Sequence, residues 1–175
     1  MGLVVQTTSV TSPRKGKLLF LCGKMAAGKS TLARQLASRE DAVLLVEDEF
    51  LERLFRGQIT DLAAYVTYSS RIREALAPLI GALLAKGVSV VLDFPANTRG
   101  QRAWFRRLID ESAAEHELHF IDAPDALCVR QLSKRSEGLP PGTQWTTEAE
   151  FHAVTKYFEP PATEEGFDVV RHERA

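Results

Sequence analysis

Five short apolar runs, separated by segments with helical periodicity, constrain the fold of this 175-residue sequence more than any other feature. The runs lie at residues 17–22, 42–47, 88–93, 118–121 and 167–170. Runs of this length and composition are typical of strands that are buried on both faces. The segments between them predict helices at residues 30–38, 49–55, 69–86, 98–114 and about 124–135. Strands that alternate with helices predict an α/β fold, a parallel sheet with helices on both faces.

The length fits one domain with a sizeable core. Residues 1–16 are polar, rich in Thr and Ser, and broken by Pro13, so we expect them to form a flexible N-terminal arm. We expect residues 17–175 to form a single domain. Its Gly/Pro-rich segment, at about residues 136–150, is predicted to be a short lid. Within it, Thr147 and Glu150 have the spacing of a capping box at a helix start.

The composition excludes several classes of protein. A net charge of −1 disfavours a nucleic-acid partner, which calls for a basic face. Cys22 and Cys128 form no CxxC pair, and the four histidines lack metal-ligand spacing, so neither a disulfide framework nor a zinc site is expected. The N-terminal sequence lacks the pattern of a signal peptide, and no apolar run approaches 20 residues. We therefore expect a cytoplasmic protein without a membrane partner.

Residues 23–30, GKMAAGKS, fit the pattern G-x-x-x-x-G-K-[ST], with a buried strand before them and an amphipathic helix after them. Backbone N–H groups of such a loop and the start of its helix point into one concavity and bind phosphates. The predicted cofactor-binding residues are Gly23, Lys24, Met25, Ala26, Ala27, Gly28, Lys29, Ser30 and Thr31. The sequence carries no NKxD motif for guanine, which favours ATP over GTP.

Lys29 is predicted to reach the β- and γ-phosphates of ATP, and the Ser30 hydroxyl to bind Mg²⁺. Asp93 ends the third apolar run, where an acid typically holds the magnesium directly or through water. A plain turn residue is the alternative for Asp93.

Three carboxylates follow the second apolar run, and of these Asp48 is predicted to be catalytic. A carboxylate at this edge of the sheet can accept the proton of a hydroxyl nucleophile. The alternative is that Asp48 only caps the following helix. Glu47 and Glu49 are expected to face solvent.

The acceptor is expected to contact Arg53, Asn97 and Arg102, although a surface salt bridge is an equal alternative for Arg53. Leu62, Tyr65 and Tyr68 are expected either to shape the acceptor pocket or to belong to the core. Arg130 and Arg135 are candidates for a lid arginine that stabilises the transferring phosphoryl group, with a helix-terminal charge as the alternative.

The motifs GKMAAGKST, EDEF, VVLDFPANTRGQR and CVRQLSKRS come in the order seen in small P-loop kinases. The chain resembles AAA_33-type ATP-binding proteins, which are similar to the zeta-toxin, chloramphenicol phosphotransferase, gluconate kinase and shikimate kinase groups. The resemblance covers about residues 17–172. It implies a P-loop NTPase fold with a five-stranded parallel sheet in the order 2-3-1-4-5. It also implies phosphate and magnesium roles for Lys29 and Ser30, substrate activation by Asp48, and a lid role for Arg130 or Arg135.

The leading interpretation is an ATP-dependent phosphotransferase that uses Mg²⁺ and acts on a hydroxyl of a small molecule. One alternative is a nucleotide-binding regulatory module with little transfer activity. The other is a polynucleotide or toxin-like kinase with a macromolecular or nucleotide-sugar acceptor.

Overall fold

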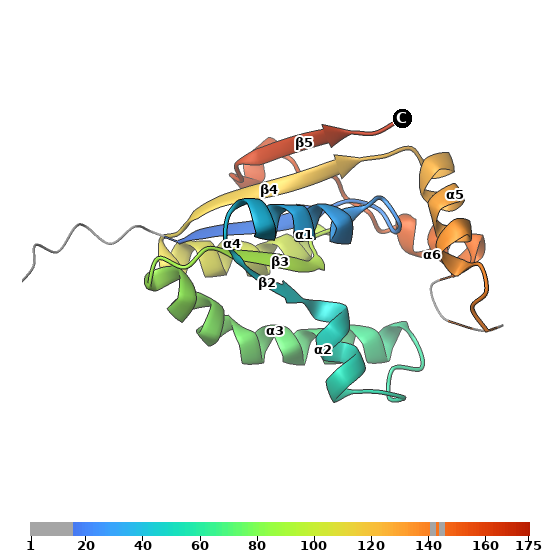
Figure 1. The fold of residues 1–175 in the computed structure, drawn as a ribbon, viewed down its shortest axis with the longest axis horizontal. Helices are drawn as coiled ribbons and strands as arrows, with labels where there is room; N and C mark the ends of the chain where they lie inside the picture. Colours follow the sequence, from blue (N-terminus) through green and yellow to red (C-terminus); the bar gives the residue numbers. More distant parts are fainter. Residues whose placement is uncertain (1–15, 141–142, 144–145) are drawn as a thin grey trace, which may run out of the picture.

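The computed structural model describes residues 16–140, 143 and 146–175. Strands and helices alternate along most of the chain (Figure 1). The strands are β1 (Lys17–Cys22), β2 (Val43–Val46), β3 (Val90–Pro95), β4 (Glu115–Asp122) and β5 (Val169–Glu173). The helices are α1 (Lys29–Arg39), α2 (Glu47–Leu54), α3 (Leu62–Ala85), α4 (Arg99–Ser112), α5 (Asp125–Ser136) and α6 (Glu148–Thr155), with a 3₁₀ turn at Thr163–Glu165. The expected arm lies almost wholly outside the described residues.

The five strands form one sheet in the order β2-β3-β1-β4-β5, and all neighbouring pairs are parallel. The predicted α/β architecture and strand order are confirmed. Because every strand runs the same way, their carboxyl ends lie together at one edge, on the right of Figure 1. The loop after β1 and the helices α2 and α5 meet at that edge.

The central strand β1 is buried on both faces because its side chains enter two separate cores. Leu18 and Phe20 pack into the core under α3 and α4, where the Phe20 and Phe105 rings stack with centroids 4.3 Å apart. Leu19 and Leu21 pack on the other face with residues of α1. Alternate side chains of an apolar strand thus serve opposite layers, as expected for a parallel sheet covered by helices.

Helix boundaries differ from the sequence prediction at two places that matter for the site. The helix α3 begins at Leu62 rather than at residue 69, because the Asp61 carboxylate caps it by accepting a hydrogen bond from the Ala64 amide at 2.8 Å. The helix α2 begins at Glu47, the residue that was predicted to end the second strand. The capping box of Thr147 and Glu150 is confirmed at the start of α6.

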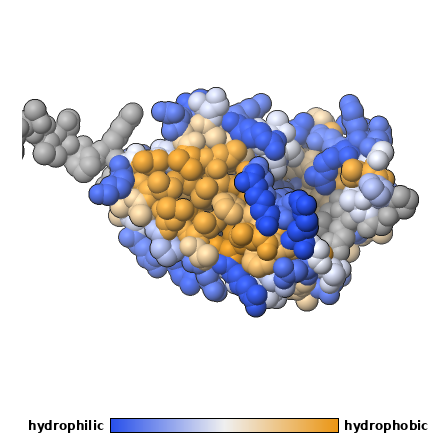
Figure 2. Space-filling model, turned by 60° about the horizontal axis from the view of Figure 1, so that its bottom comes forward, coloured by the Kyte–Doolittle hydropathy of each residue, from blue (hydrophilic) through white to orange (hydrophobic). Residues whose placement is uncertain are grey.

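The outer face of α3 is apolar along its second half. Figure 2 shows apolar side chains gathered on the face that carries this helix, where half of the Leu79 surface (50%) is exposed. Pro78 lies within α3, which continues past it to Ala85. No helix in the described part of the chain is long and apolar enough to cross a membrane.

Candidate functional site

A cleft of about 1680 Å³ opens at the carboxyl edge of the sheet. Its walls come from the loop after β1, from α2 and α3, from the start of α4, and from α5 and α6. These segments are far apart in the sequence and meet here because the strands that precede them are parallel. This is the edge at which parallel α/β sheets bind their ligands.

The loop after β1 turns tightly and leads directly into α1. Ala26 and Gly28 have φ values of 58° and 104°, and Gly28 is the N-cap residue of α1. The Lys29 ammonium folds over the loop and donates hydrogen bonds to the carbonyl oxygens of Gly23 and Lys24 at 2.7 and 2.9 Å. A loop that leads from β1 directly into a helix is the arrangement that its sequence pattern predicts.

Loss of surrounding water lowers the pKa of Lys29, while the nearby charge of Asp93 opposes that shift. The charge of Asp48 opposes that shift too, although less than the charge of Asp93. The side chain of Lys24 turns elsewhere, toward Asp125 at the start of α5 and the Ala123 carbonyl.

Ser30 and Thr31 are exposed in the first turn of α1 and line the cleft. Asp93 also lines it from β3. A hydroxyl and a carboxylate suit Mg²⁺, which binds few protein oxygens and completes its shell with phosphates and water. The described residues include no cluster of three or more His, Cys, Asp or Glu side chains that could hold a metal ion.

Asp48 is the second residue of α2, and its exposed carboxylate lines the cleft. The N-cap of α2 is Val46, and no side chain caps the helix there, so Asp48 does not act as the cap residue. The protein mass around the cleft displaces water and raises the pKa of Asp48, and the charge of Asp93 raises it further. Lys29 and Arg135 oppose these shifts. A raised pKa brings a carboxylate closer to the value that suits a proton acceptor near neutrality.

Asn97 ties the loop to the end of β3. Its side-chain oxygen accepts a hydrogen bond from the Gly23 amide at 3.0 Å, and its carbonyl accepts one from the Glu159 amide at 2.9 Å. Asn97 also lines the cleft, so a substrate contact stays a prediction for it. The observed bonds show that it positions the loop.

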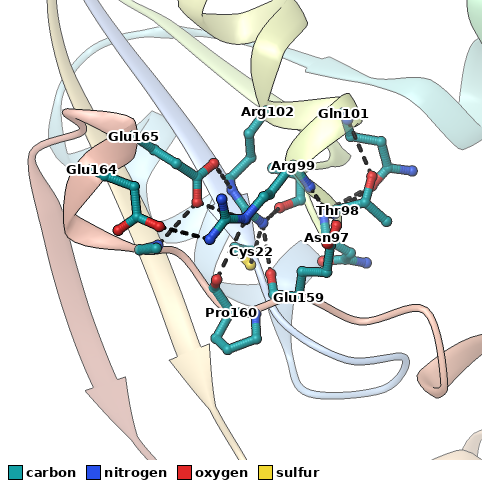
Figure 3. Close-up of polar contacts among 12 residues, drawn as sticks. Cys22, Asn97, Thr98, Arg99, Gln101, Arg102, Glu159, Pro160, Glu164 and Glu165 are labelled. Atoms are coloured by element: carbon teal, nitrogen blue, oxygen red, sulfur yellow. Dashed lines mark hydrogen bonds and ion pairs between the residues drawn. The ribbon is translucent and has the colours of Figure 1, made fainter.

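Arg102 was expected to contact the acceptor, but it does not line the cleft within the described part of the chain. Its side chain is fully buried and forms a two-pronged ion pair with Glu165, with distances of 2.7 and 2.8 Å (Figure 3). Its third nitrogen, Nη1, donates to the carbonyls of Ala96 and Glu159, and Nη2 also donates to the carbonyl of Pro160. These contacts hold the segment before β5 against α4. Arg102 therefore has a structural role and does not belong to the acceptor site.

The other predicted arginines also differ in whether they line the cleft. Arg53 is exposed, stays outside the lining of the cleft and pairs with Glu49 at 3.1 Å, which matches the surface salt bridge considered for it. Arg130 is exposed on α5 and does not line the cleft, whereas Arg135 does. Arg135 is therefore the better placed of the two lid candidates.

Sequence reasoning missed a polar cluster beneath the acceptor side of the cleft, and the prediction that Glu47 faces solvent was wrong. Glu47 is fully buried because α2 starts two residues earlier than predicted and directs this side chain toward α3. There it accepts hydrogen bonds from Tyr65, Ser69 and Arg73, all of which line the cleft. The signal was present in the sequence, since these three residues recur every four positions on one face of a helix.

Similar solved structures share this fold. A candidate kinase from Chloroflexus aurantiacus j-10-fl has a TM-score of 0.71 at 20% identity, with 91% of this chain and 89% of that chain covered. Kti12 of Chaetomium thermophilum, solved in complex with ADP-AlF3, has a TM-score of 0.63 at 15% identity, with 90% and 88% covered. The Mycobacterium tuberculosis APS kinase CysC, solved with AMPPNP and APS, has a TM-score of 0.56 at 18% identity, with 93% and 92% covered. No curated protein matches the chain significantly.

The family model described as AAA_33, an AAA domain, matches residues 18–161. The match includes the loop after β1, Asp48, Asp93 and Arg135, and it spans most of the chain. The P-loop kinase fold and the resemblance inferred from the motifs are confirmed: this chain belongs to the AAA_33 family.

Proposed function

We propose that this protein is an ATP-dependent phosphotransferase that moves the γ-phosphoryl group of ATP to a hydroxyl of a small molecule. The observation that carries the proposal is the position of Asp48. Its carboxylate is exposed in the cleft, it does not cap α2, its pKa is raised, and it interacts with Lys29 of the phosphate-binding loop. A protein that only binds ATP has no need of such a group.

In the proposed reaction, Asp48 accepts the proton of the acceptor hydroxyl. The hydroxyl oxygen forms a bond to the γ-phosphorus, the bond from that phosphorus to the bridging oxygen breaks, and ADP leaves with the electron pair. Lys29 and Arg135 line the cleft, and in the proposed reaction they would stabilise the charge on the transferring group. Ser30 and Asp93 would hold Mg²⁺, which neutralises phosphate charge when it is bound.

The test is ATP consumption with a panel of hydroxyl compounds, with wild type beside Asp48→Asn. The variant should bind ATP normally and lose about 10²- to 10⁴-fold in turnover, the range typical of a lost general base. Glu49→Gln is the matched control, because it removes a carboxylate from the next residue, which is exposed and does not line the cleft. Turnover near the wild-type rate in Asp48→Asn would assign the role to another acid.

Two alternatives give different results in the same experiment. A regulatory module would bind ATP tightly and show no turnover that depends on an acceptor. A polynucleotide kinase would accept an oligonucleotide, with binding that weakens steeply as salt is added. The small acceptor is favoured here because the cleft is a concave pocket and the chain carries a net charge of −1.

A further inference from the structure

The acceptor side of the cleft rests on a buried carboxylate with three donors. Glu47 Oε2 accepts hydrogen bonds from the Tyr65 hydroxyl at 3.0 Å and the Ser69 hydroxyl at 3.1 Å. Glu47 Oε1 accepts one from Arg73 Nε at 2.9 Å. Because Glu47 is fully buried and its oxygens are engaged, its charge is committed to holding Arg73 and does not face the cleft.

The Arg73 guanidinium is held by Glu47 through Nε, and its two terminal nitrogens remain available to a ligand. Its side chain is 13% exposed and lines the cleft. Its guanidinium carbon lies 5.9 Å from the centre of the Trp104 ring, which supports it from α4. Within the described structure, only Nε of Arg73 donates a recorded hydrogen bond. The two terminal nitrogens thus form a fixed fork, the geometry that binds a carboxylate, sulfate or phosphate with two hydrogen bonds.

A second arginine lies on the same side of the cleft. Arg107 follows Trp104 by three residues on α4, so the two share one face of the helix. It is exposed, lines the cleft, and has no recorded ion pair among the described residues. Glu74 is the acid of α3 that lines this side, and it accepts a weak hydrogen bond from Ser70 at 3.4 Å.

The charges that line the whole cleft also favour an anionic ligand. Among the described residues, eight cationic side chains and four carboxylates line it, although the chain as a whole carries a net charge of −1. Lys24, Lys29, Lys134 and Arg135 lie by the loop and α5, where the triphosphate is expected. Arg73 and Arg107 line the cleft from α3 and α4, not from the loop or α5.

We propose that the phosphoryl acceptor is itself an anion, and that its carboxylate, sulfate or phosphate group binds Arg73 and Arg107 while its hydroxyl faces Asp48. The proposal rests on the function proposed above and names its substrate class. Asp48 and the anchor of Arg73 come from the same turn of α2: Glu47, whose Oε1 accepts the bond from Arg73 Nε at 2.9 Å, directly precedes Asp48, and both Asp48 and Arg73 line the cleft. A small hydroxy acid or sugar phosphate carries a hydroxyl and an anionic group in one molecule, as this arrangement requires.

The first test compares acceptors that differ by one anionic group. Wild-type protein with MgATP is given gluconate against sorbitol, glycerol 3-phosphate against glycerol, and adenosine 5′-monophosphate against adenosine. We expect the anionic member of a pair to be phosphorylated with a KM at least tenfold lower than that of its neutral partner. The pairs separate a carboxylate from a phosphate as the recognised group. Equal KM values within every pair that is turned over would overturn the proposal.

The second test uses variants. Arg107→Gln should raise the acceptor KM about 10- to 100-fold, the range for a lost hydrogen bond to a charged group, and leave kcat unchanged. Arg73→Lys keeps the charge beside Glu47 but loses the fork, and should act in the same direction. Arg71→Gln is the control, since it removes a cation from α3 that does not line the cleft. A KM in Arg107→Gln equal to that of wild type would overturn the proposal.

A binding measurement separates failure of this proposal from failure of the proposed function. Calorimetry is done with Mg²⁺ and the non-hydrolysable analogue AMPPNP, which fills the phosphate-binding loop and prevents the anions from binding there. If the anionic member of a pair binds more tightly than the neutral one, and Arg107→Gln removes the difference, the anion site stands even without turnover. If no anionic compound binds better than its neutral partner, the site is rejected whatever the activity.

Discussion

Two ion pairs of arginine and glutamate in this protein have opposite burial. In Glu47–Arg73 the acid is 0% exposed and the arginine 13%, whereas in Arg102–Glu165 the arginine is 0% exposed and the acid 13%. Arg102 donates to Glu165 through two nitrogens and to three backbone carbonyls. Arg73 donates through Nε alone in the described structure, and its side chain lines a cleft.

The difference separates two uses of the same residue types. An arginine whose donors are all engaged by the protein fixes the fold, because nothing is left to bind a ligand. An arginine that is anchored on one edge and solvated on the other is ready to bind one. The paired acids differ in the same respect. Glu165 holds the loop before β5 in place (Figure 3), whereas Glu47 orients the side chain of Arg73.

The largest effect is expected from Arg102→Met. It removes the Arg102 donor from three carbonyls and leaves Glu165 with only the Ala162 amide. Breaking a buried pair by removing one partner costs about 3–5 kcal/mol of unfolding free energy. Urea unfolding followed by circular dichroism measures this loss. Arg106→Met is the control on the same helix, because its ion pair with Asp110 is long, at 3.6 Å, and should contribute about 1 kcal/mol or less. Similar losses in both variants would contradict a special role for Arg102.

The same conservative change at both arginines should act on different properties. Arg102→Lys removes the fork that binds Glu165 and the carbonyl contacts, and should lower the unfolding free energy by about 2 kcal/mol or more. Arg73→Lys can keep its single bond to Glu47 and should lower the unfolding free energy by about 1 kcal/mol or less, while it raises the acceptor KM. Urea unfolding and steady-state kinetics on both variants measure the two properties. The comparison fails if Arg73→Lys is the more destabilised protein and binds the acceptor normally.

The sequence predicts a region well when the interacting residues of that region are close together along the chain. The strand β1, the loop at residues 23–30 and the capping box of Thr147 and Glu150 depend on neighbours within a few residues, and local spacing predicted them. Arg102 pairs across 63 positions and Arg73 across 26. Spacing can place residues on one helix face, but it does not identify a partner so far along the chain, so Arg102 was assigned to the acceptor and Arg73 was overlooked. The capping residue Asp61, just before α3, was the local clue that extends the helix to Tyr65 and so places Tyr65, Ser69 and Arg73 on one face.

The Arg102–Glu165 pair should make the free energy of unfolding depend on pH. Burial alone would raise the pKa of Glu165, but the hydrogen bonds from Arg102 and the Ala162 amide outweigh it and hold the pKa below its ordinary value of 4.5. A depressed pKa means that the stabilisation is complete above that ordinary value and is lost as pH falls through the lower, folded-state value. Glu165→Gln cannot titrate, so its stability relative to wild type should improve as the pH is lowered below 4.5. Urea midpoints at pH 7 and pH 3 test this, and a constant difference between the two proteins would refute it.

The smallest effect should come from Ser69→Ala, which removes one of three donors to Glu47. The carboxylate keeps the bonds from Tyr65 and Arg73, so we expect a loss of about 1 kcal/mol in unfolding free energy and an unchanged acceptor KM. Ser70→Ala is the matched control, since Ser70 is exposed and bonds only weakly to Glu74 at 3.4 Å, and its loss should stay within about 0.5 kcal/mol. If Ser69→Ala instead raises the acceptor KM tenfold, Arg73 is held in place only when all three donors surround Glu47. The Glu47 cluster would then act as one unit in binding, as the Arg102 network acts as one unit in folding.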